Sequence, residues 1–372
     1  MNILYISFLN GDSWAGPTYS VPKQIEAQAK YDNVFWYNIR ETKVEEWKNK
    51  PYYYDLRDYP NERIRDLPSP FNSPDIIMVE QFYGFAGKKI VRELESSKTP
   101  YVIIPRGELT SSAQKRKQWK KIIANALIFY KFSRKATAIQ YLTEQEKKDS
   151  GDKWNKNSII IPNGIPVPNN TKTEYCNSGI RCIAIGRIEP YHKGLDMLIE
   201  ACGMIADNLR KASCTIDIFG PDYDGKVAEL KKQISLLSLE DIIQYHEGLY
   251  GEDKERELLN SDVFLLTSRF EGHPMALIEA LSYGLPCVVT RGSNMKSEVE
   301  EYQAGWTAEN NVESIKEALL DMIENKSLVS VKGKNAIMLS EQYRWDNIAQ
   351  ISSTKLSELC DRFNGEYREE TK

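Results

Sequence analysis

Short apolar runs rich in β-branched residues alternate with segments of helical periodicity along most of the chain, and the alternation occurs twice. It predicts parallel sheets with helices on both faces, which is the α/β class. With 372 residues, the chain exceeds an ordinary single-core domain. The two stretches are separated at 161–172 by IPNGIPVPNNTK, whose prolines and asparagines indicate a linker. The sequence therefore predicts two doubly wound, Rossmann-like domains that face a central cleft.

The linker sets the predicted domain boundaries. The first domain is expected to cover 1–165 and the second 173–344, with a final helix at 345–372 packing back on the first domain. The expected strands are Asn2–Phe8, Val34–Asn38, Ile76–Glu80, Tyr101–Pro105 and Ala138–Leu142, then Gly179–Ile185, Thr215–Phe219, Ile242–Tyr245, Val263–Thr267, Cys287–Thr290 and Gly305–Ala308. The expected helices include Ser20–Tyr31, Gly87–Glu95, Leu195–Leu209, Val227–Leu237, Met275–Tyr283 and Trp345–Phe363.

Bulk composition argues against several classes of protein. The formal net charge is -4, so no global positive field favours nucleic acid. No apolar run approaches the ~20 residues that span a bilayer. The N-terminal MNILYISF reads as a strand, because it lacks the basic region and cleavage site of a signal peptide. The six cysteines form no CxxC pair and are interpreted as buried thiols in a reducing compartment, so a cytoplasmic protein is expected.

The segment Ser268–Thr290, SRFEGHPMALIEALSYGLPCVVT, is the most informative part of the sequence. It reads as a loop, a helix, a glycine stop and a strand. Pro274 suits the first helical turn, where a missing N–H costs no hydrogen bond, and Gly284 suits the helix end. Gly272 and His273 are therefore expected at a helix N-terminus, whose free N–H groups and dipole attract anions.

Two glutamates accompany this expected anion site. Glu271 lies in the loop, and Glu279 follows eight positions later on the helix. An acidic side chain beside a phosphate site needs another partner, such as the hydroxyl groups of a sugar. Either glutamate taken alone is also consistent with a solvated surface charge.

The spacing Glu271-x7-Glu279, with Gly272 after the first glutamate, resembles the signature of retaining GT-B glycosyltransferases of family 4 (glycosyl transferases group 1). The resemblance implies that Glu271 contacts the donor-sugar hydroxyls and that Glu279 binds the nucleotide ribose. The segment GRIEPYHKGLDMLIEA resembles the family's Gly-Arg…Lys-Gly segment. That resemblance implies that Arg187 and Lys193 hold the donor diphosphate.

The resemblance runs from about Met1 to Trp345. WAGPTYSV resembles the glycine-rich first loop, which places Gly16 near the donor, although Gly16 is equally consistent with a simple turn. PRGEL resembles the loop that faces the acceptor, but it offers Arg106 and Glu108 where many relatives carry a histidine. The resemblance also assigns donor contacts in the second half to Gly186, Gly272, His273, Met275 and Ala276.

The implied reaction transfers a sugar from a nucleotide sugar, with a UDP-sugar favoured, to a saccharide or lipid-linked saccharide in polysaccharide or glycan biosynthesis. Arg187 and Lys193 would stabilise the leaving diphosphate electrostatically. No metal or other cofactor is expected, because Asp222-Tyr-Asp224 lies in a Gly/Pro-rich segment and is interpreted as a turn. The family implies retention of configuration. Since no nucleophile stands out, same-face attack guided by the leaving phosphate is the favoured mechanism.

A basic segment precedes an apolar one in the first half. Lys115–Lys121, KRKQWKK, is followed by the apolar stretch Ile122–Phe132. Lysine and arginine near an anionic bilayer contribute ~1 kcal/mol each, so this segment is a candidate for peripheral membrane contact. The alternative is that the helix packs inside the first domain.

Three other functions fit paired α/β domains. A nicotinamide-dependent oxidoreductase is disfavoured, because the first loop, Leu9–Pro17, contains Gly11 and Gly16 but no GxGxxG. Glu41 alone is a weak candidate for a ribose ligand. A sugar-nucleotide epimerase would keep the fold and change the chemistry. A non-catalytic sugar-nucleotide-binding subunit is also open, because of the altered PRGEL loop.

Overall fold

The computed structural model describes residues 1–12, 16–85, 87–115, 118–175, 179–222 and 225–370, and for residues 112 and 366–370 it describes the backbone alone. The chain forms two compact units. The first is Met1–Gly164 with Trp345–Lys372, and the second is Ile165–Arg344. The division between them lies inside the predicted linker, and the final helix groups with the first unit.

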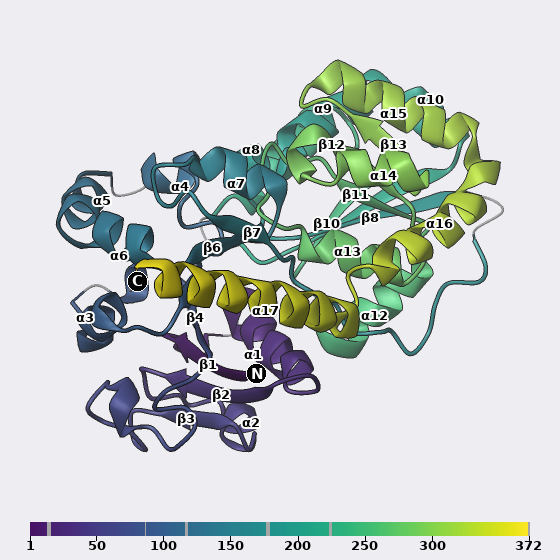
Figure 1. Ribbon diagram of the computed structural model, residues 1–372. Helices are drawn as coiled ribbons and strands as arrows, with labels where there is room; N and C mark the ends of the chain where they lie inside the picture. The colour runs from purple at the N-terminus through teal and green to yellow at the C-terminus, as the bar shows by residue number, and fades with distance from the viewer. Residues whose placement is uncertain (13–15, 86, 116–117, 176–178, 223–224, 371–372) are drawn as a thin grey trace. The chain divides into compact units, whose positions relative to one another are not determined.

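The first unit contains, within the described residues, a seven-stranded sheet in the order β3-β2-β1-β4-β5-β6-β7 (Figure 1). Its strands are β1 (Asn2–Ser7), β2 (Asn33–Asn38), β3 (Tyr53–Asp55), β4 (Ile76–Glu80), β5 (Tyr101–Ile104), β6 (Ala138–Tyr141) and β7 (Ser158–Ile160). All of these pairings are parallel. The strand order reverses between β1 and β4, and doubly wound sheets bind ligands at the carboxyl ends of strands at such a switch point.

Each face of this sheet has its own apolar core, because successive residues of a strand point to opposite faces. Leu4 and Ile6 of β1 join one core with α3 and α6, whereas Ile3 and Tyr5 join another with α1 and α17. The helices of the unit are α1 (Gly16–Gln28), α2 (Glu45–Lys48), α3 (Lys89–Ser96), α4 (Ser111–Lys115), α5 (Gln118–Ala124), α6 (Tyr130–Lys135), α7 (Glu144–Ser150) and α17 (Trp345–Glu370). Shorter turns are η1 (Ile64–Asp66), η2 (Tyr83–Phe85) and the π-helical η3 (Asn125–Phe129).

The C-terminal helix α17, yellow in Figure 1, packs against α1 of the same unit. Leu356, Leu359 and Cys360 are buried in the core that also contains Val21 and Ile25 of α1. Apolar packing therefore holds α17 on the first unit, although it follows the second unit in the sequence.

The second unit contains a six-stranded parallel sheet within the described residues, in the order β10-β9-β8-β11-β12-β13. Its strands are β8 (Ile180–Ile185), β9 (Cys214–Phe219), β10 (Ile243–His246), β11 (Val263–Leu266), β12 (Cys287–Thr290) and β13 (Gly305–Ala308). The order reverses between β8 and β11, so the loops that follow these two strands lie at the switch point.

Helices cover both faces of the second sheet. Cys182 and Ala184 of β8 join a core with α9, α11 and α15, whereas Ile183 joins one with α13, α14 and α16. The helices are α8 (Pro190–Lys193), α9 (Leu195–Met204), α10 (Ala206–Lys211), α11 (Val227–Leu236), α12 (Gly251–Asn260), α13 (Met275–Ser282), α14 (Lys296–Tyr302), α15 (Val312–Glu324) and α16 (Val329–Glu341). Shorter 3-10 turns are η4 (Arg291–Ser293) and η5 (Lys326–Leu328).

The predicted strands are all present, with ends that differ by one residue or less. Two strands were not predicted: β3 and β7 are three residues long and form the edges of the first sheet, too short to show an alternating pattern. The prediction of a single helix at Leu195–Leu209 is wrong. The segment divides into α9 and α10, because Ile205 adopts φ -124° and ψ 23° between them.

Candidate active site in the second unit

The carboxyl end of β8 leads into the predicted diphosphate-binding segment. Gly186 and Arg187 follow the strand, and Gly194 is the C-cap of α8. Gly194 is left-handed, with φ 64°, and a Cβ there would lie 1.9 Å from the carbonyl oxygen of Thr267. Glycine is therefore required at this position, where the chain passes close to the end of β11.

Lys193 and Glu271 form an ion pair, although they are 78 positions apart in the sequence. Lys193 Nζ lies 2.7 Å from Glu271 Oε1, and the two side chains are 19% and 11% exposed. Ser268 Oγ donates to the same carboxylate oxygen at 2.6 Å, and Asn294 Nδ2 donates to the Glu271 carbonyl oxygen. The structure thus brings together the lysine predicted for the diphosphate and the glutamate predicted for the sugar.

The loop after β11 is fixed to α8 and α9 by further hydrogen bonds. Thr267 Oγ1 donates to the carbonyl oxygens of Lys193 and Gly194 at 3.2 and 3.1 Å. Arg269 forms two hydrogen bonds to the Asp196 carboxylate, at 2.7 and 2.9 Å. Paired bonds between a guanidinium and a carboxylate fix the geometry more strictly than one contact does. The two loops at the switch point are therefore held as one assembly.

Helix α13 begins directly after the predicted anion-binding loop. Pro274 occupies the N-cap rather than the first helical turn, which corrects the prediction by one position. Gly272 is exposed, and no atom lies within 4 Å of the place where its Cβ would stand. The Met275 N–H donates to the His273 carbonyl oxygen at 3.0 Å, so one of the predicted donors is already engaged. The His273 ring lies 5.6 Å from the Tyr343 ring, between centroids.

Glu279 follows Ala276 by about one turn of α13, and both side chains are partly buried. The Glu279 carboxylate forms a short ion pair with Lys254 of α12. Sequence reasoning missed Lys254, because the two residues lie 25 positions apart on different helices. Lys254 therefore holds in place the carboxylate of Glu279, the residue that is predicted to bind the ribose.

Arg187 differs from the other predicted charged residues, because its side chain is exposed. Across the part of the chain that the structure describes, its guanidinium forms no ion pair. Arg187 lines a small pocket together with Gly186, Lys193 and Thr267. An exposed guanidinium beside Lys193 is available to an anionic ligand.

His192, at the same switch point, is held as a neutral side chain. Its ring stacks on Phe270, with 4.4 Å between centroids, and its Nε2 lies 2.8 Å from the Phe270 carbonyl oxygen. Burial, together with neighbouring Lys193, lowers the pKa of the imidazole. The neutral ring donates its Nε2–H to the carbonyl, so His192 fixes the loop and adds no positive charge near pH 7.

The first unit contains the two predicted acceptor-side residues. Arg106 has φ 49° and a side chain that is 5% exposed, with its Nε 2.8 Å from Oε2 of the fully buried Glu80. Its terminal nitrogens donate to three further side chains, those of Ser20, Gln24 and Asn163. In this structure the guanidinium is engaged by internal partners.

Glu108 is also held internally. Its Oε2 accepts hydrogen bonds from the backbone N–H groups of Phe82 and Tyr83 at 2.6 and 3.2 Å. Glu146 accepts from the Gly107 N–H at 2.5 Å and so fixes the PRGEL loop from the other side. Burial raises the pKa of both carboxyl groups, whereas the hydrogen bonds oppose that shift. The predicted role of this loop toward an acceptor stays a prediction.

Gly16 is the first residue of α1, and it is exposed, with open space around its Cβ position. Residues 13–15, which complete the predicted glycine-rich loop, lie outside the described residues. The Gly16 carbonyl oxygen accepts a hydrogen bond from Ser20 Oγ at 3.2 Å, and the predicted role of Gly16 toward the donor stays a prediction.

The predicted membrane segment Lys115–Lys121 is described in part, because residues 116 and 117 lie outside the described residues. Trp119 of α5 is 79% exposed. The apolar stretch that follows is divided. Phe129 is fully buried in the core of the first unit, whereas Ile123 and Leu127 are exposed. Packing inside the unit thus accounts for only part of the stretch.

The predicted turn at Asp222 is present on the side that the structure describes. Asp222 Oδ1 accepts from the Lys226 N–H at 2.8 Å, and Asp224 lies outside the described residues. Among described residues, no group of three or more His, Cys, Asp or Glu side chains could hold a metal ion. The described cysteines are free and buried, and Cys176 falls in an undescribed gap. No helix that the structure describes is long and apolar enough to cross a membrane.

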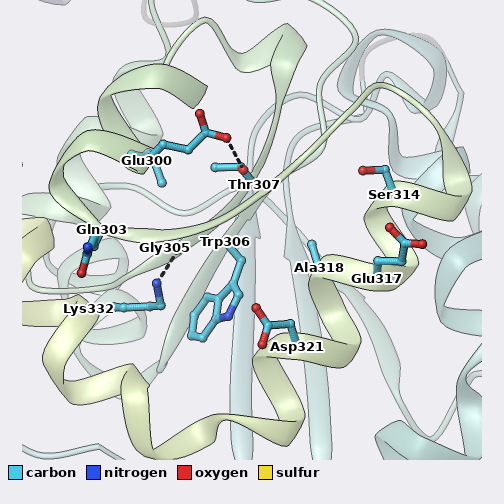
Figure 2. Close-up of a pocket in the computed structure, with 11 residues that line it drawn as sticks. Glu300, Gln303, Gly305, Trp306, Thr307, Ser314, Glu317, Ala318, Asp321 and Lys332 are labelled. Atoms are coloured by element: carbon cyan, nitrogen blue, oxygen red, sulfur yellow. Dashed lines mark hydrogen bonds between the residues drawn. The ribbon is translucent and has the colours of Figure 1, made fainter.

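Figure 2 shows a different cavity of the second unit, about 470 Å³ in volume, around Trp306 of β13. Lys332 Nζ donates to the Gly305 carbonyl oxygen at 2.8 Å, and Thr307 Oγ1 donates to Glu300 at 2.7 Å. None of the predicted site residues is among those that line this cavity. Its lining combines carboxylates with one lysine, and its place in the fold differs from the β8–β11 switch point.

Comparisons with known proteins show what the second unit is similar to. Residues 178–338 match the family model described as glycosyl transferases group 1. An amylovoran biosynthesis glycosyltransferase from Erwinia amylovora is 30% identical over 185 residues, which cover 46% of this chain and 44% of the relative. The chain spans 58%, 24% and 44% of the length of three curated relatives that it matches.

Solved structures extend the similarity to the whole fold. Sucrose-phosphate synthase from Thermosynechococcus elongatus has a TM-score of 0.70 at 13% identity. The superposition covers 96% of this chain and 98% of the synthase chain. Anabaena HepE in complex with UDP and glucose has a TM-score of 0.67 at 17% identity, and the superposition covers 96% of this chain and 100% of the HepE chain. The likeness confirms the predicted GT-B fold. The chain is thus a GT-B protein whose residues 178–338 are similar to the glycosyl transferases group 1.

Proposed function

We propose that this chain is a retaining glycosyltransferase that moves a sugar from a nucleotide sugar, with a UDP-sugar favoured, to a saccharide or lipid-linked saccharide. The contact between Lys193 and Glu271 carries the proposal. A ligand held by both side chains needs a hydroxyl-bearing group directly beside an anionic one. The sugar and diphosphate of a nucleotide sugar have this arrangement.

The charges of the second unit suit the breaking of a sugar–phosphate bond. The diphosphate gains negative charge as the bond breaks, and fixed positive groups stabilise that charge best. Arg187 and Lys193 supply it, and the N-terminus of α13 adds its dipole. We assign Glu271 to the sugar hydroxyls and Glu279 to the ribose, with Gly16, Gly186 and the start of α13 near the donor.

The comparisons support this proposal over the alternatives. The match to glycosyl transferases group 1 covers Arg187, Lys193 and both glutamates. The relative named for amylovoran biosynthesis supports a role in polysaccharide or glycan biosynthesis, and the HepE structure with UDP supports a UDP-sugar donor. No comparable observation favours an oxidoreductase or an epimerase.

Turnover with a panel of UDP-, GDP- and ADP-sugars tests the proposal. We expect one nucleotide sugar to yield free nucleoside diphosphate and a new glycoside. Binding of a nucleotide sugar without turnover, for every acceptor tried, would favour a non-catalytic subunit. Hydride transfer with a nicotinamide cofactor would overturn the proposal.

Retention and metal independence are further parts of the proposal. Same-face attack guided by the leaving phosphate gives a product with the donor's anomeric configuration, which NMR of the product measures. An inverted product would exclude that mechanism. We also propose that Arg187 and Lys193 replace a metal, so activity should survive EDTA. Loss of activity on chelation, restored by Mg²⁺ or Mn²⁺, would contradict this part.

We also propose that α5 and η3 bring the chain to an anionic membrane surface, which suits a lipid-linked acceptor. The exposure of Trp119, Ile123 and Leu127 beside lysines supports the contact. Trp119→Ser with Leu127→Ser should reduce sedimentation with anionic vesicles, whereas Leu236→Ser, at an exposed position of the second unit, should not. Equal binding of both variants would defeat the membrane proposal.

A further inference from the structure

A cavity of about 430 Å³ in the first unit is lined mainly by positively charged side chains. Its lining residues are Arg63, Arg65, Gly87, Lys88, Lys89, Arg92, Glu93 and Ser96. Five of these carry a positive charge and one a negative charge, in a protein whose formal net charge is -4. Positive charge is therefore concentrated at this cavity, although the protein as a whole carries a net negative charge.

The acidic side chains around this cavity already have partners. Glu62 pairs with Lys88 at 2.8 Å. Both oxygens of Glu93 accept backbone N–H groups of η1, at 3.0 and 3.3 Å. Asp66 accepts from the side chain of Asn61 at 2.9 Å. Lys88 and Arg65 are thus paired with Glu62 and Asp66, and Glu93 is held by η1, so among the described residues the unpaired positive charge of the lining is that of Arg63, Lys89 and Arg92.

Three of the cations are exposed and free to bind a ligand. Arg63, Lys89 and Arg92 lie on the surface, and among described residues their side chains form no ion pair and no hydrogen bond. They come from two segments, the loop before η1 and the first turns of α3, and all three line the cavity. Guanidinium groups present paired donors that match the oxygens of a phosphate.

The position in the fold also favours a ligand. The cavity includes the beginning of α3, which follows β4 at the carboxyl edge of the sheet, beside the β1–β4 switch point. The Phe8 ring follows β1 and lies 5.2 Å from both Arg40, which follows β2, and Lys88. Arg40 and Lys88 therefore lie near the carboxyl end of β1, at the edge where doubly wound sheets bind their ligands.

We propose that this basic cavity binds a phosphate group of the acceptor, so that the first unit selects a phosphate-bearing acceptor over a neutral saccharide. Arg63, Lys89 and Arg92 are the residues that hold the phosphate. That the phosphate belongs to an acceptor rests on the proposed glycosyltransferase function, whereas the phosphate site itself does not. A sugar phosphate and a lipid phosphate share this chemistry.

The test measures binding of two phosphate probes to protein saturated with UDP, so that the donor site is occupied. The probes are glucose 1-phosphate and dihexanoyl phosphatidic acid at concentrations below micelle formation, with glucose as the neutral control. Calorimetry is run on the parent, on Arg63→Ala/Lys89→Ala/Arg92→Ala, and on Lys98→Ala. Lys98 is a matched control, because it is an exposed lysine beyond the opposite end of α3.

We expect at least one probe to bind the parent, and the triple variant to bind it roughly tenfold more weakly or worse, since charged hydrogen bonds are lost. Lys98→Ala should bind as the parent does, and raising the salt concentration should weaken binding in the parent. The probe that shows this pattern identifies the source of the phosphate. If neither probe binds, or if the triple variant binds both unchanged, the inference is overturned.

UDP binding in the same variants separates this inference from the proposed function. The triple variant should bind UDP as tightly as the parent, because the charged residues assigned to UDP, Arg187, Lys193 and Glu279, lie in the second unit. If the parent binds no nucleotide, the donor assignment fails, and phosphate binding measured without UDP still decides the basic cavity. If UDP binds and the triple variant binds the phosphate probes as tightly as the parent does, the donor assignment stands and the basic cavity is an ordinary solvated surface.

Discussion

Both units place charged side chains just after strands of a parallel sheet, yet they surround those charges differently. Arg106 follows β5 and binds four side chains of its own unit, including the fully buried Glu80. Lys193 and Glu271 form a partly exposed pair near the exposed Arg187. A charge enclosed by internal partners stabilises a loop, whereas a partly exposed pair can exchange its partner for a ligand.

The largest expected difference concerns stability. Arg106→Ala leaves Glu80 buried without its cation and should lower the free energy of unfolding by about 3–5 kcal/mol. Lys193→Ala should cost roughly 1 kcal/mol, because Glu271 keeps its Ser268 bond and some contact with water. Urea denaturation of both variants measures this, with Arg134→Ala as an exposed arginine control. A larger loss for Lys193→Ala would reverse the comparison.

The second prediction concerns activity and runs in the opposite direction. Lys193→Ala should reduce kcat and weaken donor binding, each by roughly tenfold or more, because the diphosphate charge grows in the transition state. Arg187→Ala should act in the same way. Lys232→Ala, an exposed lysine of α11, is the control and should keep normal turnover. Normal kinetics in the Lys193 variant would place the diphosphate elsewhere.

Much of the fold could be predicted because strand signals are local. Cys287–Thr290 and Gly305–Ala308 have the bounds that the sequence indicates, since each is a short β-rich run between turn signals. The edge strand Tyr53–Asp55 gives no such signal. Its place in the sheet is set by parallel pairing with β2, a contact that propensity alone does not reveal.

The candidate site could be predicted by residue type but not by partner. The family resemblance selects Lys193 and Glu271, yet no local pattern joins residues 78 positions apart. The contact of Glu279 with Lys254 was missed for the same reason. Arg106 shows the opposite problem. Its residue type and its position in a loop suggest that it binds a ligand, but tertiary packing buries its side chain.

The third prediction separates the two carboxylates of the second unit. Glu279→Ala should weaken binding of free UDP roughly tenfold, because the ribose loses a charged hydrogen bond. Glu271→Ala should leave UDP binding nearly intact while it reduces transfer, because UDP lacks the sugar. Calorimetry with UDP beside transfer kinetics measures both effects. The opposite pattern would show that the two roles are exchanged.

The smallest expected effect concerns pH and the enclosed charges of the first unit. Burial raises the pKa of Glu108, so the folded state holds this proton at a higher pH than the unfolded chain does. The protonated group therefore contributes stability that is fully present below its unfolded pKa, about 4.3, and is lost as the pH rises through the raised value. The amide introduced by Glu108→Gln has no proton to lose, but its oxygen can still accept the two N–H bonds.

The stability of the parent relative to Glu108→Gln should thus fall as the pH rises from about 4 to about 8, with a slope of at most about 1.4 kcal/mol per pH unit. Urea denaturation of both proteins across that range measures the difference. Glu46→Gln on α2 makes the same chemical change at an exposed position and is the control. A difference that stays constant or grows with pH would show that the two backbone N–H bonds outweigh burial. Glu108 would then be held as an anion by these two bonds.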